Sequence, residues 1–207
     1  MYIPAPFRET NLERLDFLAA QNSFGTLVST TAAGPFATHL PVLYQREGKA
    51  VSLKGHWARA NCQWQGIDSQ RVLFILHGPH AYISPRWYAE PARNVPTWNY
   101  VAAHLYGRVR LIEDARDLAE LVGALAAFYE ADASTPWRLE DSKDSRALLG
   151  AIVGFELAVD EIQLKFKLNQ NHPAVNVCGA ISALRAKSGE NSAAIAELMQ
   201  QELARRA

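Results

Sequence analysis

The stretch that decides the fold reads FGTLVSTTAAGPFATHLPVLYQ and occupies residues 24–45. Residues 24–31 are rich in β-branched side chains, which favour strands. Ala-Gly-Pro at residues 33–35 is typical of a turn, and residues 36–45 then favour a returning strand. Pro41 cannot donate a ladder hydrogen bond, so it indicates an edge position or a bulge. The stretch therefore predicts a β-hairpin.

Four further segments outside this hairpin have the length and patterning of strands. Residues 50–55 form a short apolar stretch, and residues 71–78 form a continuous apolar run typical of a buried strand. Residues 97–114 favour one long strand or two interrupted at Gly107. Residues 153–169 alternate apolar and polar side chains, as a half-buried strand does. About six antiparallel strands with helical cover are expected, which indicates a small barrel or sheet.

Helices are expected between and after the strands. The clearest runs over residues 114–132, where Asp114 is the expected N-cap and leucines line one face. Residues 56–66 also favour a helix, because they contain alanines and two tryptophans seven positions apart. Other helices are expected at residues 12–22, 145–152, 173–187 and 191–206.

Length and composition bound the class of protein. A chain of 207 residues and 22.9 kDa suits one domain, here residues 1–207 with a helical C-terminal extension over about 173–207. Hydrophobic residues are 49% and charged residues 20%, as in an ordinary globular protein. Only two cysteines are present, and the N-terminus has prolines where a signal peptide needs an apolar core. We expect a cytoplasmic protein with no membrane-spanning helix.

Charge is balanced overall but distributed unevenly along the chain. The formal net charge is zero, so bulk attraction to DNA, RNA or anionic lipid is not expected. Residues 51–110 are nevertheless locally basic and contain four of the five tryptophans, whereas residues 111–150 are acidic. Such a basic, aromatic stretch suits a flat anionic ligand, which needs stacking faces and phosphate partners. An aromatic core with a solvated basic rim is the alternative.

Common catalytic signatures are absent from the sequence. It contains no P-loop, GxGxxG, HExxH or GxSxG motif. A zinc site could be drawn from His56, His77, His80 and His104, but their spacing is nonspecific and we expect no metal. No acid–base pair marks a substrate site, so we rank binding above catalysis and predict no catalytic residue.

Six blocks of the sequence resemble the PaiB family, described as FMN-binding negative transcriptional regulators. They are THLPVL (38–43), GHWARANCQW (55–64), GPHAYISPRWY (78–88), VPTWNYVAAHLYG (95–107), IVGFEL (152–157) and KFKLNQN (165–171). Their order and spacing cover roughly residues 1–185. The chain departs from the family at Cys62, where proline is usual, at Asn169 in the KLSQN motif, and at His172, where arginine is common.

The resemblance implies a fold and a function class. The fold is an α+β, mainly β, FMN-binding split barrel with Greek-key topology and peripheral and C-terminal helices. The resemblance relates this fold to pyridoxine-phosphate oxidases and haem-utilisation proteins. It also implies a homodimer with FMN at the subunit interface, as is usual for split barrels. The implied function is a dimeric FMN-binding regulator. A flavin-dependent oxidoreductase and a haem-handling protein, with a histidine on the iron, are the alternatives.

The resemblance also implies residues that bind FMN. They are Thr38, His39, Leu40, His56, Arg59, Asn61, Trp98 and Asn99. A helical GHWARAN segment would present Arg59 to the phosphate, because a guanidinium fork matches phosphate oxygens. Asn61 and His56 would complete the phosphate site, and the THLPVL backbone would contact the flavin edge. Trp98 and Asn99 would cover the ring or reach the ribityl chain.

Two features have more than one interpretation. Strand alternation puts Lys165 and Lys167 on one face and Phe166 inward. Solvated lysines are the default. The candidate partners of the lysine face are the acidic residues 132–144, a second subunit or a phosphate-bearing ligand, and the roles of Gln170 and Asn171 stay open. The sequence has no helix-turn-helix with a basic recognition helix, so DNA remains a possible partner that cannot be derived from it.

Overall fold

The computed structural model describes residues 1–135, 137–139 and 142–206. Its strands are β1 (Arg8–Glu9), β2 (Phe24–Thr31), β3 (Gly34–Pro41), β4 (Leu43–Glu47), β5 (Ala50–Ala58), β6 (Arg71–Ile83), β7 (Thr97–Ile112) and β8 (Ile152–Lys167). Its helices are α1 (Leu12–Gln21), α2 (Ala115–Tyr129), α3 (Lys143–Gly150), α4 (Ala174–Arg185) and α5 (Glu190–Ala204). Short 3₁₀ helices occur at η1 (Ala5–Phe7), η2 (Cys62–Trp64), η3 (Pro85–Trp87) and η4 (Pro91–Arg93).

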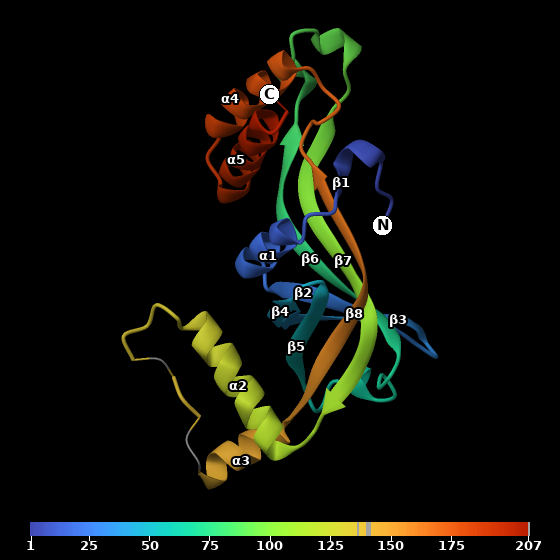
Figure 1. Ribbon diagram of the computed structural model, residues 1–207, viewed down its shortest axis with the longest axis vertical. Helices are drawn as coiled ribbons and strands as arrows, with labels where there is room; N and C mark the ends of the chain where they lie inside the picture. The colour runs from blue at the N-terminus through green and yellow to red at the C-terminus, as the bar shows by residue number, and fades with distance from the viewer. Residues whose placement is uncertain (136, 140–141, 207) are drawn as a thin grey trace. The chain divides into compact units, whose positions relative to one another are not determined.

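The strands form one mostly antiparallel sheet in the order β3-β2-β6-β7-β8-β5-β4, with β1 paired to β8 (Figure 1). The mainly β fold class expected from the sequence is confirmed. The described residues contain eight strands rather than about six. One reason is Pro41, which ends β3, so that the expected returning strand divides into β3 and β4. The hairpin of β2 and β3 is confirmed, and β3 lies at the sheet edge.

The chain divides into two compact units, which are described separately. Unit 1 consists of residues 1–11, 77–103 and 163–207, and unit 2 of residues 12–76 and 104–162. No described helix has both the length and the apolar composition needed to cross a membrane.

The core of unit 2 is built from the inward side chains of β2, β5, β6 and β8. Trp57 is fully buried, and its ring centroid lies 4.5 Å from that of Phe155. Leu53 and Phe74 are also fully buried. Asp114 caps α2 as expected, because its carboxylate accepts hydrogen bonds from the first backbone N–H groups of the helix.

Gly107 lies inside one continuous strand, β7, rather than between two. A Cβ atom at this position would lie 2.0 Å from the carbonyl oxygen of Ala158 on β8. Glycine is therefore required for a close approach of two backbones, not for a break in the strand.

Helices α4 and α5 lie side by side in unit 1 (Figure 1). Val177, Ile181 and Leu184 of α4 and Ile195 and Met199 of α5 are almost completely buried. The two closing helices expected from the sequence are thus confirmed, and their packing arises from apolar residues at helical spacing.

The prediction of a helix at residues 56–66 is wrong. Strand β5 continues to Ala58, and Trp57 pairs with Val153 of β8. Only Cys62–Trp64 is helical, as the 3₁₀ turn η2. Burial of the Trp57 ring against the sheet outweighs the weak helical preference of the alanines, since propensity differences are well below the free energy of burying an aromatic ring.

The expectation of solvated lysines on β8 is also wrong. Lys165 is only 5% exposed, and its ammonium donates to the Tyr2 carbonyl (3.1 Å) and the Tyr100 hydroxyl (2.6 Å). Lys167 donates to Thr97 Oγ1 and to the carbonyl of Trp98. Burial, together with the neighbouring charge of Lys165, lowers the pKa of Lys167. Neutral oxygens of unit 1, rather than solvent, therefore satisfy this pair.

Candidate functional site

The candidate site in unit 2 lies where β5 ends and the chain continues into η2. Beyond Ala58 the chain leaves the β5–β8 ladder, and the Arg59 N–H donates to the carbonyl of Ala151 (2.7 Å). The Trp64 indole N–H donates back to the carbonyl of Arg59 (2.8 Å). These bonds fix both ends of a short loop, residues 59–64, which carries two of the expected ligand-binding side chains.

Gln63 attaches this loop to the sheet. The side chain is 2% exposed, and its Oε1 accepts the indole N–H of Trp57 at 3.0 Å. Its Nε2 lies within hydrogen-bond distance of the Leu27 and Phe36 carbonyls (3.1 and 3.2 Å) and of Ser29 Oγ (3.1 Å). One buried amide therefore connects the loop to β2, β3 and β5.

Arg59 already has three partners within unit 2. Its Nε donates to the Gly150 carbonyl (2.9 Å) and Nη2 to the Ile152 carbonyl (3.0 Å), while Nη1 lies 3.3 Å from Glu113 Oε1. The guanidinium also lies over the Trp64 ring, 5.6 Å from its centroid. Arg59 nevertheless keeps 39% of its side-chain surface exposed. These contacts hold the guanidinium in one orientation while leaving part of it accessible.

Asn61 connects η2 to the edge strand. Its Oδ1 accepts the Gln63 N–H (2.9 Å), which makes Asn61 the N-cap of η2, and its Nδ2 donates to Thr38 Oγ1 (3.0 Å). Next along β3, His39 is exposed and its Nδ1 lies 2.9 Å from Thr26 Oγ1. Leu40 is 6% exposed and therefore belongs to the core rather than to the surface. The structure thus brings Asn61 and Thr38 together, on the edge strand predicted from Pro41.

His56 faces a different side of β5 from Trp57, because side chains alternate along a strand. It pairs in register with Gly154, whose Cα is covered by Leu118 and Leu121 of α2. Within the described chain, His56 Nδ1 is buried and has no hydrogen-bond partner. Burial lowers the pKa of His56, which favours the neutral imidazole.

Trp98 and Asn99 belong to unit 1. The Trp98 side chain is 52% exposed and forms an aromatic cluster with His80 and Tyr82, with ring centroids 6.2 and 6.0 Å away. Asn99 is fully buried; its Nδ2 lies 3.3 Å from Met199 Sδ, and its Oδ1 has no partner among the described residues. Trp98 is therefore available to a ligand or partner surface, and Asn99 is part of the interior.

Sequence reasoning missed two residues of this site. Gln63 sits inside the GHWARANCQW block, but a glutamine carries no pattern that distinguishes a buried amide from a solvated one. Glu113 lies 54 positions from Arg59 in the chain, directly after the end of β7, and only the fold places the two together. Of the four histidines considered for zinc, His56 and His104 lie in unit 2 and His77 and His80 in unit 1; the described residues contain no cluster suited to a metal ion.

Comparison with known proteins agrees with the fold and identifies the family. The chain is 38% identical over 206 residues to "Protease synthase and sporulation protein PAI 2" of Bacillus subtilis, covering 98% of each chain. Its fold resembles the FAD and heme binding protein of Mycobacterium smegmatis (TM-score 0.60, 16% identity, 84% of this chain and 79% of that one). It also resembles the flavocytochrome Anf3 of Azotobacter vinelandii (TM-score 0.57, 18% identity, 77% and 69% covered). Residues 1–161 match the model of the family described as "Putative FMN-binding domain". The chain therefore belongs to this FMN-binding family, the family of the Bacillus PAI 2 protein, and its cofactor is FMN.

Proposed function

We propose that the protein is a homodimeric, FMN-binding regulatory protein that holds the FMN phosphate at Arg59. The observation that carries the proposal is the resemblance to PAI 2, which covers 98% of each chain and therefore spans the loop that holds Arg59. FMN, when bound, supplies a redox-active isoalloxazine ring. The contributions of the chain itself are recognition of the phosphate, of the ribityl hydroxyls and of the ring edge.

The geometry of Arg59 fits a phosphate. A guanidinium has five N–H groups, and three of them donate to Gly150, Ile152 and Glu113. Two N–H groups have no acceptor among the described residues, and two is the number that a bidentate phosphate contact uses. The two backbone carbonyls hold the fork in place, so little conformational entropy is lost when an anion binds. The Glu113 carboxylate would repel the phosphate, so its side chain would have to turn away from Arg59 when FMN binds.

Neighbouring groups suit the remaining parts of FMN. Thr38 and Asn61 present a hydroxyl and an amide beside the edge strand, and ribityl hydroxyls pair with such groups. Strand β3 has a neighbour on one side only, so its backbone can contact the polar edge of the isoalloxazine ring. The orphaned Nδ1 of His56 is a buried polar atom that a ligand hydroxyl would satisfy.

Titration with FMN tests the phosphate contact. Arg59→Ala should weaken FMN binding by roughly 2–3 kcal/mol, about 30- to 160-fold, because a charged hydrogen-bonding partner is lost. Arg71→Ala is the matched control, since Arg71 is an exposed arginine of the same unit that pairs with Asp160 and Glu161. Urea unfolding of each FMN-free variant separates a loss of affinity from a loss of fold.

Glu113→Gln provides a test of opposite sign. Removing the carboxylate 3.3 Å from Arg59 should strengthen FMN binding, by up to about fivefold, since an exposed ion pair contributes up to about 1 kcal/mol. Unchanged affinity in both Arg59→Ala and Glu113→Gln would move the phosphate site elsewhere.

The regulatory role needs a readout in cells. We expect cells that carry Arg59→Ala in place of the wild-type chain to show the transcript changes of a deletion strain, with Arg71→Ala resembling wild type. A deletion strain whose transcripts match wild type would contradict the regulatory role while leaving FMN binding intact.

A further inference from the structure

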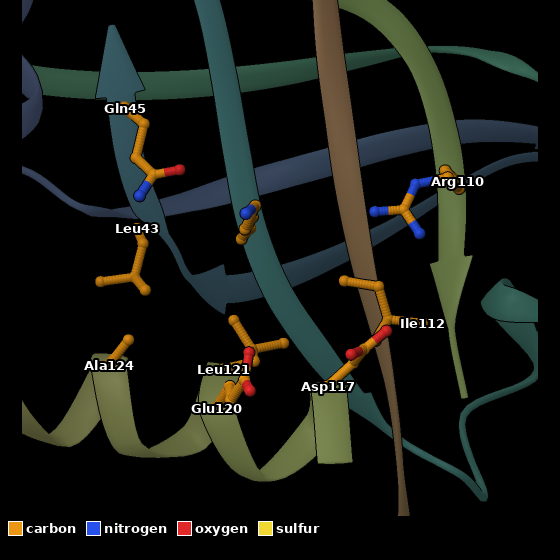
Figure 2. A pocket seen from close by; sticks show the side chains of 9 residues that line it. Leu43, Gln45, Arg110, Ile112, Asp117, Glu120, Leu121 and Ala124 are labelled. Atoms are coloured by element: carbon orange, nitrogen blue, oxygen red, sulfur yellow. The ribbon is translucent and has the colours of Figure 1, made fainter. Parts of the chain in front are cut away.

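A cavity of about 340 Å³ lies between α2 and the face of the sheet formed by β4, β5 and β7 in unit 2 (Figure 2). Leu43 and Gln45 enter it from β4, and Arg110 and Ile112 from β7, while α2 forms the opposite wall. Lys54 of β5 completes the sheet side, since it pairs in register with Leu43. None of the residues in the proposed FMN site lines this cavity.

Charged side chains of both signs line the cavity. Arg110 is paired with Glu156 (2.6 Å), the residue opposite Lys54 in register. On α2, Glu120 is paired with Arg116 (3.1 Å). Of the four charged side chains that line the cavity, one basic and one acidic side chain are not part of these two ion pairs.

Those two side chains are Lys54 and Asp117. Neither forms a side-chain hydrogen bond or an ion pair with another described residue, and the Gln45 amide likewise has no partner there. A cation and an anion therefore line the same cavity without pairing with each other. A ligand that carries both charges would satisfy both of them at once, whereas a singly charged ligand would satisfy only one.

The apolar part of the lining limits the ligand further. Leu43 is 9% exposed, Ile112 6% and Leu121 5%, and all three line the cavity together with the charged groups. The volume is at the lower end of the range for ligand pockets, which spans about 300–1,000 Å³. The lining thus suits a molecule of amino-acid size with a hydrocarbon side chain rather than a nucleotide.

We propose that this cavity binds a small zwitterion with an apolar side chain, of the class of L-leucine, L-methionine and L-phenylalanine. The carboxylate lies toward Lys54 and Arg110, the ammonium toward Asp117 and Glu120, and the hydrocarbon on Leu43 and Leu121. The site is separate from the FMN site and adds a small-molecule input to the protein. Binding is measured with and without FMN, so its failure and that of the FMN site are distinguishable.

Three ligands with the same hydrocarbon test the zwitterion requirement. L-leucine, 4-methylpentanoate, which lacks the ammonium, and 3-methylbutylamine, which lacks the carboxylate, are titrated by calorimetry and ligand-observed NMR. We expect leucine to bind with a dissociation constant below about 1 mM, and each truncated ligand to bind at least about tenfold more weakly, because one charged partner is then left unsatisfied.

Variants assign each charge to its partner. Lys54→Gln should weaken leucine binding about tenfold and leave the affinity for 3-methylbutylamine unchanged. Asp117→Asn should weaken leucine binding and leave the affinity for 4-methylpentanoate unchanged. Lys49→Gln and Glu47→Gln, in and beside the β4–β5 turn and outside the lining, are the matched controls. The proposal is overturned if none of the three amino acids binds at about 10 mM, or if leucine affinity is the same in both cavity variants and the wild type.

Discussion

Replacing Gln63 by methionine tests how the loop over residues 59–64, where we propose the FMN phosphate binds, is attached to the sheet. Methionine has almost the same length as glutamine but neither donates nor accepts strongly, so the variant removes the polar contacts without opening a large cavity. In the wild-type chain the buried amide accepts from Trp57 Nε1 and donates toward Leu27 and Phe36 of β2 and β3.

The magnitude follows from what the variant leaves unpaired. The Trp57 indole N–H is fully buried, and a buried donor without a partner costs about 1–3 kcal/mol. Loss of the donated hydrogen bonds adds about 1 kcal/mol, and relief from burying the amide offsets part of this. We therefore expect Gln63→Met to lower the free energy of unfolding by about 2–3 kcal/mol. Gln65→Met, at an exposed position directly after this loop, should change it by under about 0.5 kcal/mol.

Urea unfolding followed by circular dichroism measures both variants, and a double-mutant cycle isolates the Trp57 contact. In a Trp57→Phe background no indole N–H remains, so Gln63→Met should cost about 1–2 kcal/mol less than in the wild-type chain. An equal cost in both backgrounds, or a loss below about 0.5 kcal/mol in the single variant, would refute the attachment of the loop through Gln63.

Three further predictions concern assembly, DNA and pH. Light scattering should give twice the 22.9 kDa of one chain, because the barrels that this family resembles pair and Trp98 is exposed; a mass of one chain across micromolar dilutions would refute the dimer. Specific DNA binding should be weak and fall with salt, since the net charge is zero; a nanomolar footprint at physiological salt would show a missed DNA-binding surface. The pKa of Asp16 is held below its usual 3.8 by hydrogen bonds from Arg46 and then Tyr44. The ionised Asp16 carboxylate therefore stabilises the folded chain fully above about pH 5, and this contribution is lost as the pH falls through the lowered folded-state pKa. Asp16→Asn should unfold more easily at pH 7 and show a flatter loss of stability below pH 4; an unchanged acid profile would contradict this.

Strands and helix ends could be predicted where signals from neighbouring residues were sufficient. The hairpin at residues 24–41 follows from β-branched residues, a Gly-Pro turn and Pro41, and all three act within a few residues. The N-cap of α2 at Asp114 is equally local. In these segments no long-range contact opposes the local preference, which is why structure and prediction agree.

Residues 56–66 show where local reasoning fails. Alanines favour a helix by a few tenths of a kcal/mol each, whereas the position of Trp57 is decided by Phe155 and Val153, about a hundred residues away. The prediction that Lys165 is solvated fails for the same reason, because its partners Tyr2 and Tyr100 are distant in the chain. The family resemblance singled out Arg59, whose contact with the FMN phosphate stays a prediction, whereas Glu113 and Gln63 could be found only from the folded structure.

The most direct test of the account is a crystal structure of the chain with FMN. We expect the phosphate to lie within hydrogen-bond distance of the Arg59 guanidinium, with Glu113 turned away from it and Arg59 still donating to the Gly150 and Ile152 carbonyls. A phosphate bound instead in the cavity lined by Lys54, or at any place out of reach of Arg59, would contradict it.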